Sequence, residues 1–129
     1  MNGLLDTSAV IAIAGGQALT LPDAAAISAM TLAELHVGVL RAKTSAQRAG
    51  RVRTVAVVER ELEVLPIEER VARCFGELVS AARDAGRKPG VADALIAATA
   101  IAHDLPLYTC DDDFAGLAGV EVVRADHVD

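Results

Sequence analysis

Aromatic residues are almost absent from this sequence of 129 residues. There is no tryptophan, and the aromatic side chains are Phe75, Tyr108 and Phe114. Each of them lies in an apolar context, so we expect all three to be buried. A surface that stacks nucleic-acid bases is therefore not expected, because such surfaces need exposed aromatic rings. Recognition of a nucleic acid would have to rest on its backbone and shape.

Cysteines and long hydrophobic runs are also scarce. Cys74 and Cys110 are too few and too far apart for a disulfide framework or a four-ligand zinc site, so a reducing cytoplasm is the expected compartment. Cys74 fits an ordinary core position. The apolar start of the chain lacks a basic segment and is interrupted by Asp6, so we expect no signal peptide there. No tract approaches the roughly 20 apolar residues that a membrane span requires.

Acidic residues are missing from residues 35–58, although the chain carries a formal charge of −6. A negative charge argues against a nucleic-acid partner, because phosphate binding relies on Lys and Arg. The distribution of charge argues the other way, although a solvated helical surface is the alternative explanation. The candidate phosphate-binding residues are Arg41, Lys43, Arg48, Arg51 and Arg53 in this stretch, followed by Arg87 and Lys88.

Short apolar runs alternate with helical patterns along the chain. We predict strands at residues 2–5, 24–28, 62–67, 107–109 and 121–124, and helices at about 7–14, 32–43, 46–61, 68–85 and 91–103. Thr7 or Ser8 is a candidate cap for the first helix, and Thr31 for the second. Strands that alternate with helices indicate a parallel sheet covered on both faces. The predicted fold is a three-layer α/β/α sandwich with a central, mainly parallel sheet, in one domain over residues 1–129.

Four acidic residues stand where predicted strands end or helices begin. Asp6 follows the first strand, and Glu34 lies in the first turn after the second. Asp93 opens a helix, and Asp111 follows the fourth strand. In an open parallel sheet such positions share the edge outside the carboxyl ends of the strands, where ligands bind. We therefore predict one acidic pocket at this edge.

Each acid also has a purely structural explanation. Asp6 can cap the first helix, and Thr31 with Glu34 fits a capping box. Asp93 gains about 0.3 to 1 kcal/mol from the helix macrodipole, and residues 111–113 can form a polar turn. Together, however, these carboxylates would repel one another, by roughly 4 kcal/mol for a pair about 4 Å apart at an effective dielectric constant of about 20. Bound protons or a cation must offset that repulsion.

The oxygen-only character of this predicted pocket indicates the kind of cation. A site without nearby Cys or His favours Mg²⁺ or Mn²⁺ over zinc. Mg²⁺ keeps positions open for phosphate oxygens and can activate water, so the site suits hydrolysis of a phosphodiester. None of the histidines is assigned to catalysis: His36 points to a different helix face from Glu34, His103 ends a helix, and His127 is in the tail.

The chain resembles the PIN domain, and within it the VapC-type ribonuclease toxins of toxin-antitoxin pairs, in the segments LLDTSAVI, ISAMTLAELHVGV and PGVADALIAATAIAHDLPLYTCDDDF. The resemblance implies endonucleolytic cleavage of RNA with Mg²⁺ or Mn²⁺ coordinated by Asp6, Glu34, Asp93 and Asp111. It places Asp113 as an auxiliary ligand and Asp112 toward solvent. The hydroxyls of Thr7, Ser8 and Thr109 resemble the small polar groups that support this pocket.

The same resemblance implies two protein partners. One is a small antitoxin whose C-terminal segment wraps the toxin and obstructs the acidic pocket, and the other is a second copy of the toxin in a homodimer. The alanine-rich helices before Glu61 are candidates for the antitoxin surface, although core packing explains them as well. The basic residues named above would then guide the RNA backbone past the metal.

A receiver-like signalling module, which binds Mg²⁺ without nuclease activity, is the main alternative. Lys88, Pro89 and Thr109 match such a module weakly. A receiver has two adjacent acids after its first strand, however, where this chain has Asp6 alone. Phosphate transfer from a small phosphodonor distinguishes the two. A phosphatase with an aspartyl nucleophile would need a second acid at Ser8, and the presence of all four acids disfavours an inactive binding protein.

Overall fold

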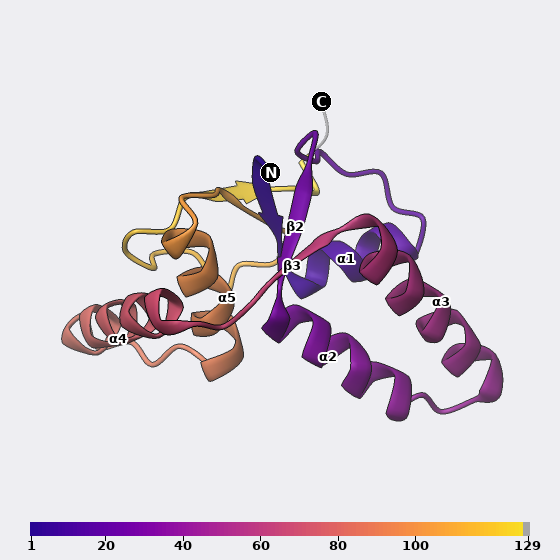
Figure 1. Ribbon diagram of the computed structural model, residues 1–129. Helices are drawn as coiled ribbons and strands as arrows, with labels where there is room; N and C mark the ends of the chain where they lie inside the picture. The colour runs from indigo at the N-terminus through magenta and orange to yellow at the C-terminus, as the bar shows by residue number, and fades with distance from the viewer. Residues whose placement is uncertain (128–129) are drawn as a thin grey trace.

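The computed structural model describes residues 1–127, and residues 128–129 lie outside the described range. Strands and helices alternate as predicted (Figure 1). The elements are β1 Gly3–Leu5, α1 Thr7–Ala14, β2 Ala25–Ser28, α2 Ala29–Leu40, α3 Ser45–Glu61, β3 Glu63–Leu65, α4 Glu69–Asp84, α5 Val91–Ala102, β4 Leu107–Thr109 and β5 Val122–Arg124.

The strands form one sheet in the order β3-β2-β1-β4-β5, and every pairing is parallel. The chain runs outward from β1 to β2 and β3, and then crosses to the other side of β1 for β4 and β5. This reversal leaves the carboxyl ends of β1 and β4 side by side, which is where open α/β sheets bind ligands. Leu5 pairs with Tyr108, so the residues that follow, Asp6 and Thr109, emerge together at that edge.

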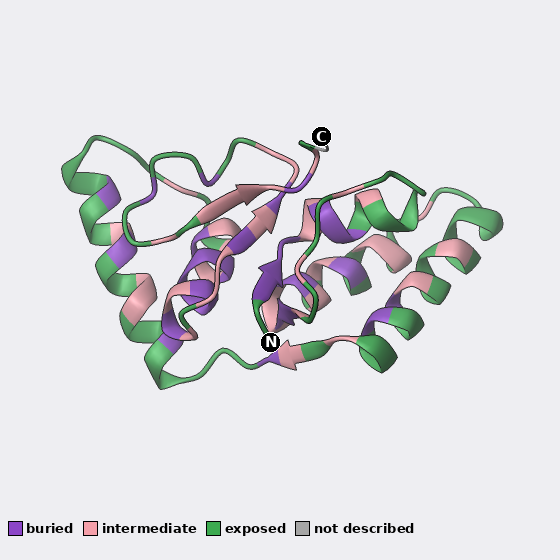
Figure 2. Ribbon diagram, turned by 90° about the horizontal axis from the view of Figure 1, so that it is seen from above, coloured by how far each residue is buried: buried purple, intermediate pink, exposed green. Residues whose placement is uncertain are grey.

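Consecutive residues of β1 face opposite layers of the molecule. Leu4 is fully buried in a core formed with α4 and α5. Leu5 packs into a second core formed with α1, α2 and α3. Figure 1 shows these two groups of helices on opposite sides of the sheet, and Figure 2 shows buried residues on the helix faces directed toward it. The predicted three-layer sandwich with its parallel sheet is confirmed.

The boundaries of helix α2 and strand β3 differ most from the prediction. Helix α2 begins at Ala29 because Ser28, at the end of β2, is the cap, and its Oγ accepts a hydrogen bond from the Met30 amide at 3.0 Å. The predicted cap, Thr31, is instead buried within the first turn. The helix ends at Leu40 instead of residue 43. Strand β3 is shorter than predicted and stops before Pro66, which cannot donate to a ladder.

Side-chain burial also departs from the prediction in places. Phe114 is buried, but Phe75 and Tyr108 are only partly buried. Cys74 and Cys110 are both free thiols and partly buried. Within residues 1–127, no helix is both long enough and apolar enough to cross a membrane.

A methyl group added at Gly3 is expected to destabilise the protein. Its Cβ would lie 2.7 Å from both Pro22 Cγ and Tyr108 Cε1, so the Gly3→Ala variant must shift the sheet or its neighbours, at about 1 to 3 kcal/mol. Gly76 is the matched control, because it lies in α4 with nothing within 4 Å of an added Cβ. Gly76→Ala should stabilise the helix by up to about 1 kcal/mol. Urea denaturation measures both changes, and equal stability of the two variants would contradict this close packing.

Candidate active site

Asp6 is the most deeply buried acid at the carboxyl edge, with 2% of its surface exposed. It caps α1, since its Oδ1 accepts a hydrogen bond from the Ala9 amide at 2.9 Å. The Ser8 hydroxyl donates to the same carboxylate at 2.8 Å, and the Thr109 hydroxyl donates at 2.6 Å. Burial raises the pKa of Asp6, these hydrogen bonds oppose the rise, and the charge of Asp111 adds to it. Asp6 is therefore a helix cap and a pocket acid at once, and neither Thr7 nor Ser8 is the cap.

Glu34 is held by α1 and not by its own helix cap. The Thr7 hydroxyl donates to Glu34 Oε1 at 2.7 Å and lies 3.2 Å from the hydroxyl oxygen of the buried Thr31. The capping box predicted for Thr31 and Glu34 is wrong, because the cap is Ser28, three residues earlier. Glu34 consequently lies in the second turn of α2, where its carboxylate turns toward the start of α1.

Asp93 lies in the first turn of α5, and the charges of the other pocket acids all affect its pKa. Burial is the largest cause that raises its pKa to about 6, and the rest of the rise comes from neighbouring negative charges on Asp113, Asp111, Glu34 and Asp6. Carboxylates from the residue after β1, from α2 and from the loop after β4 thus lie within electrostatic range of Asp93. The structure brings together the acids that the sequence placed at one edge.

Arg124 at the end of β5 holds the loop that carries three consecutive aspartates. Its Nη2 donates to the Cys110 carbonyl oxygen at 3.0 Å and to Asp126 Oδ2 at 2.9 Å. Its Nη1 pairs with Asp112. Asp112, whose side chain is 89% exposed, is therefore turned toward β5 and solvent. Sequence reasoning missed Arg124 and Asp126, because their role depends on the pairing of Thr109 with Arg124 in neighbouring strands.

The register of the aspartates follows from these contacts. The Asp111 amide donates to the Thr109 hydroxyl oxygen at 3.1 Å, and the Asp113 amide donates to Asp111 Oδ1 at 3.0 Å. Asp111 and Asp113 both raise the pKa of Asp93, and Asp112 is not among the main causes of that rise. The loop thus presents its first and third acids to the pocket and its second acid to Arg124.

The donor chemistry of the pocket fits a hard divalent cation. The acids offer carboxylate oxygens, which Mg²⁺ and Mn²⁺ prefer. Burial raises the pKa of the neighbouring Cys110 thiol, which therefore stays protonated and is a poor ligand for a soft metal. Within residues 1–127, no three acidic, His or Cys side chains form a ready-made metal-binding group. Burial and the neighbouring negative charges raise the pKa of Asp93, and a divalent cation would relieve the repulsion among these charges.

A polar hollow of ≈ 360 Å³ adjoins the acids, and two of the predicted basic residues line it. Its lining consists of Arg87, Lys88, Pro89, Gly90, Asp93, Asp112 and Asp113.

The other five basic residues lie elsewhere. Arg41, Lys43 and Arg48 lie around the turn between α2 and α3, at the end of this helical hairpin that is remote from the sheet (Figure 1). Arg51 donates to the Gly38 carbonyl oxygen at 2.6 Å and so ties α3 to α2. Arg53 lines a different groove.

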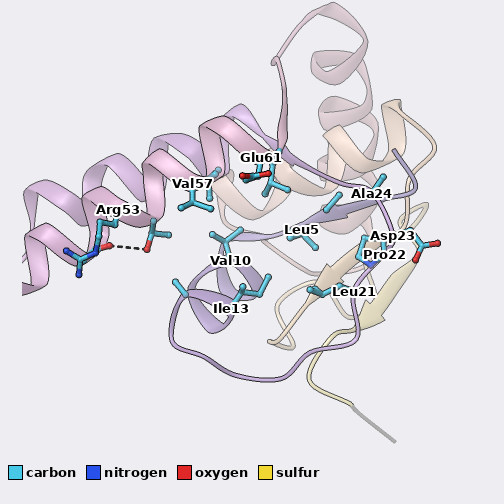
Figure 3. Close-up of a pocket in the computed structure, with 16 residues that line it drawn as sticks. Leu5, Val10, Ile13, Leu21, Pro22, Asp23, Ala24, Arg53, Val57 and Glu61 are labelled. Atoms are coloured by element: carbon cyan, nitrogen blue, oxygen red, sulfur yellow. Dashed lines mark hydrogen bonds between the residues drawn. The ribbon is translucent and has the colours of Figure 1, made fainter.

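That groove, of ≈ 800 Å³, lies between α1, α3 and the segment before β2 (Figure 3). Most of its lining is apolar, and three of the side chains are substantially exposed: Ile13 by 39%, Leu21 by 43% and Val57 by 46%. Charged residues at the groove are Asp23, Arg53 and Glu61. An exposed apolar surface bordered by charges is typical of an interaction site.

Comparisons with known proteins agree with this geometry. Residues 3–120 match the PIN domain family model. The chain is 42% identical over 128 residues to ribonuclease VapC5 of Mycobacterium tuberculosis, covering 95% of this chain and 94% of that protein. It is 45% identical over 101 residues to ribonuclease VapC8 of the same organism, covering 76% and 89%. The crystal structure of VapBC-5 from M. tuberculosis, a member of the VapBC family of toxin-antitoxin systems, matches with a TM-score of 0.83 and 39% identity, over 95% of this chain and 98% of that one.

The parallel sheet with acids at the β1 and β4 edge is thus the PIN fold. The chain belongs to the PIN-domain family and, within it, to the VapC ribonucleases. The receiver-like alternative is wrong. In agreement with this, the Thr109 hydroxyl is engaged by Asp6, and Lys88 lies in a loop before a helix.

The Asp93→Asn variant should be more stable than the wild type near pH 7 when divalent cations are absent. The pKa of Asp93 is raised in the folded state, from 3.8 to about 6, so ionisation opposes folding as the pH rises through this interval. The gain should be on the order of 1 kcal/mol, because water still screens a partly buried carboxylate, and it should disappear below about pH 4. Urea denaturation in EDTA at both pH values measures it. Glu77→Gln, an exposed position in the middle of α4, is the control, and an equal pH dependence in both variants would contradict the charge cluster.

Proposed function

We propose that this protein is the toxin of a toxin-antitoxin pair and that it cleaves RNA endonucleolytically with Mg²⁺ or Mn²⁺. The observation that carries the proposal is the gathering of acids from three other segments of the chain around Asp93 in α5. The ribonucleases and the toxin-antitoxin complex to which the chain is similar support it.

In this proposal Asp6, Glu34, Asp93 and Asp111 hold the metal, with Asp113 as an auxiliary ligand. A divalent ion held there would supply Lewis-acid chemistry, that is, activation of water and stabilisation of the leaving oxygen of the phosphodiester. The chain's own hydroxyl groups orient the ligands, since Ser8 and Thr109 donate to Asp6 and Thr7 donates to Glu34. Histidine takes no part, in keeping with the position of His36 on the outer face of α2, 3.7 Å from Glu59.

The basic residues have two roles in this proposal. Arg87 and Lys88 contact the RNA beside the acids, because they line the same hollow. Arg41, Lys43, Arg48, Arg51 and Arg53 form a second basic surface on the α2 and α3 hairpin and attract the RNA over a longer range. Arg51 has the smaller share, since it already donates to Gly38.

The antitoxin binds, in this proposal, in the apolar groove between α1 and α3. Helix α1 links that groove to the acidic pocket, because Asp6 caps its first turn and Ile13 and Ala14 line the groove at its other end. Its 8 residues span about 12 Å, a distance that an extended segment covers with about four residues. An antitoxin segment seated in the groove therefore reaches the pocket easily. The toxin itself forms a homodimer, which light scattering of the purified protein tests.

The purified protein should cleave structured cellular RNA with Mg²⁺ or Mn²⁺ and not with EDTA. Asp93→Asn should lower the cleavage rate by more than about 100-fold, because loss of a ligand exceeds the effect of losing a group that only orients one. Asp104→Asn is the matched control. It makes the same change at the opposite end of α5, where Asp104 has a φ of 53° that Asn tolerates. Cleavage by the Asp93 variant at the wild-type rate would remove the acids from the mechanism.

Val57→Glu should weaken binding of the cognate antitoxin by at least about tenfold and leave RNA cleavage unchanged, because it places a charge in the apolar groove. Val52→Glu is the control. It lies on the same helix with a similar exposure, 48% against 46%, but does not line the groove. Calorimetric titration of the antitoxin measures both affinities. Equal losses in the two variants, or no loss in either, would show that the antitoxin binds elsewhere.

A further inference from the structure

We infer that Arg87 is the residue that binds an RNA phosphate beside the acids. The absence of a side chain at Gly116 leaves the space in which the Arg87 guanidinium lies. The inference rests on the proposed ribonuclease function and deepens it. It distinguishes one arginine at the pocket from the general basic surface, and it assigns a role to a loop residue that carries no functional group.

The backbone at Arg87 is fixed by the end of α4. Gly86 has a φ of 76°, the left-handed conformation that ends helices, and the Arg87 amide donates to the Ala82 carbonyl oxygen at 2.7 Å. Pro89 then stiffens the short connection to α5. The side chain of Arg87 therefore leaves a held loop and lines the hollow that Asp93 and Asp113 share.

The guanidinium of Arg87 lies directly against the backbone of Gly116 in the turn that follows the aspartates. A Cβ at Gly116 would collide with Arg87 Nη1 and would lie 3.4 Å from Cζ. Gly116 also has a φ of 78°, which favours glycine. An added Cβ would displace the free end of the Arg87 side chain and not the backbone. Glycine thus lets the side chain cross from one loop to the other and reach the hollow.

The positive charges at this hollow form no ion pair within the described residues. Among residues 1–127, neither Arg87 nor Lys88 has a carboxylate within ion-pair distance, although three aspartates line the same hollow. Other arginines are already engaged: Arg124 by Asp112 and Asp126, and Arg51 by Gly38. The Arg87 side chain has no hydrogen-bond partner in the described chain.

An unpaired guanidinium beside an acidic pocket fits an oxyanion, and in a ribonuclease the oxyanion is a phosphate diester of the RNA. The planar group offers paired donors that match two phosphate oxygens, which a lysine cannot do. The acids alone would repel RNA. The Arg87 guanidinium, which lines the same hollow as Asp93, offsets this repulsion for a neighbouring phosphate of the RNA. Arg87 is therefore a substrate-binding residue that sets where the RNA backbone lies relative to Asp93.

The test is RNA binding in EDTA, where no cleavage occurs, measured by fluorescence anisotropy with a short labelled single-stranded RNA over a range of NaCl concentrations. Arg87→Ala should weaken binding about tenfold and reduce the slope of log affinity against log salt by about 1. Arg87→Lys should keep the slope and recover only part of the affinity. Arg83→Ala is the control, an exposed arginine in the last turn of α4 that does not line the hollow, and should change the affinity by less than about twofold.

The role of Gly116 has its own matched pair of variants. Asn tolerates a positive φ, so Gly116→Asn adds a Cβ against Arg87 with limited backbone strain. Gly16→Asn is the control, because Gly16 has a similar φ of 84° and nothing within 4 Å of an added Cβ. Gly116→Asn should lower RNA affinity, Gly16→Asn should not, and the double variant Arg87→Ala with Gly116→Asn should bind no more weakly than Arg87→Ala alone.

The outcomes separate this inference from the proposed function. Wild-type protein that neither binds RNA in EDTA nor cleaves it with Mg²⁺ or Mn²⁺ would overturn the proposed function. Wild-type protein that does both, with Arg87→Ala showing unchanged affinity and slope, would overturn only the role of Arg87. Equal RNA affinities of the Gly116 and Gly16 variants would overturn the role of Gly116 in positioning Arg87.

Discussion

Repulsion among the carboxylates around Asp93 is the constraint on which the rest of the pocket depends. Each acid alone would turn outward to water, where its charge is solvated at no cost. The fold prevents this by placing them at strand ends and helix starts that share one edge of the sheet. The energetic consequence is recorded in the raised pKa of Asp93, which reports the neighbours' charges as well as its own burial.

Hydroxyl groups beside the acids stabilise the carboxylates by donating hydrogen bonds to them. Ser8 and Thr109 donate to Asp6, and Thr7 donates to Glu34. A hydroxyl group stabilises and orients an anion without adding a positive charge, whereas a lysine or arginine would neutralise it. Arg124, which pairs with a carboxylate of this loop, pairs with Asp112 and not with Asp111 or Asp113. The pocket therefore keeps its negative charge, which is the property that a cation site requires.

Much of this architecture follows from local sequence patterns, and the remainder depends on contacts between distant segments. The alternation of strands and helices predicts the layers, and parallel strands predict the shared edge for Asp6, Glu34, Asp93 and Asp111. The start of α2 was predicted three residues late, because both Ser28 and Thr31 are good caps and only the end of β2 decides between them. The resemblance to the PIN domain implies that Asp111 and Asp113 serve the pocket and that Asp112 faces solvent. The role of Arg124 in holding Asp112 could not be predicted, since it depends on how β5 pairs with β4. The same limit applies to Arg87 and Gly116, which meet only when two loops fold together.

The pairing of β1 with β4 has a consequence for the synthesis of this protein. Residue 5 pairs with residue 108 as well as with residue 27, so the strand that leads to Asp6 lacks its β4 neighbour until most of the chain has left the ribosome. Until then Asp6 also lacks the Thr109 hydroxyl, and the pocket lacks Asp111 and Asp113. Contacts of such long sequence separation are slow to form. An enzyme that destroys RNA is thereby kept incomplete while it is still attached to the RNA-based machine that translates it.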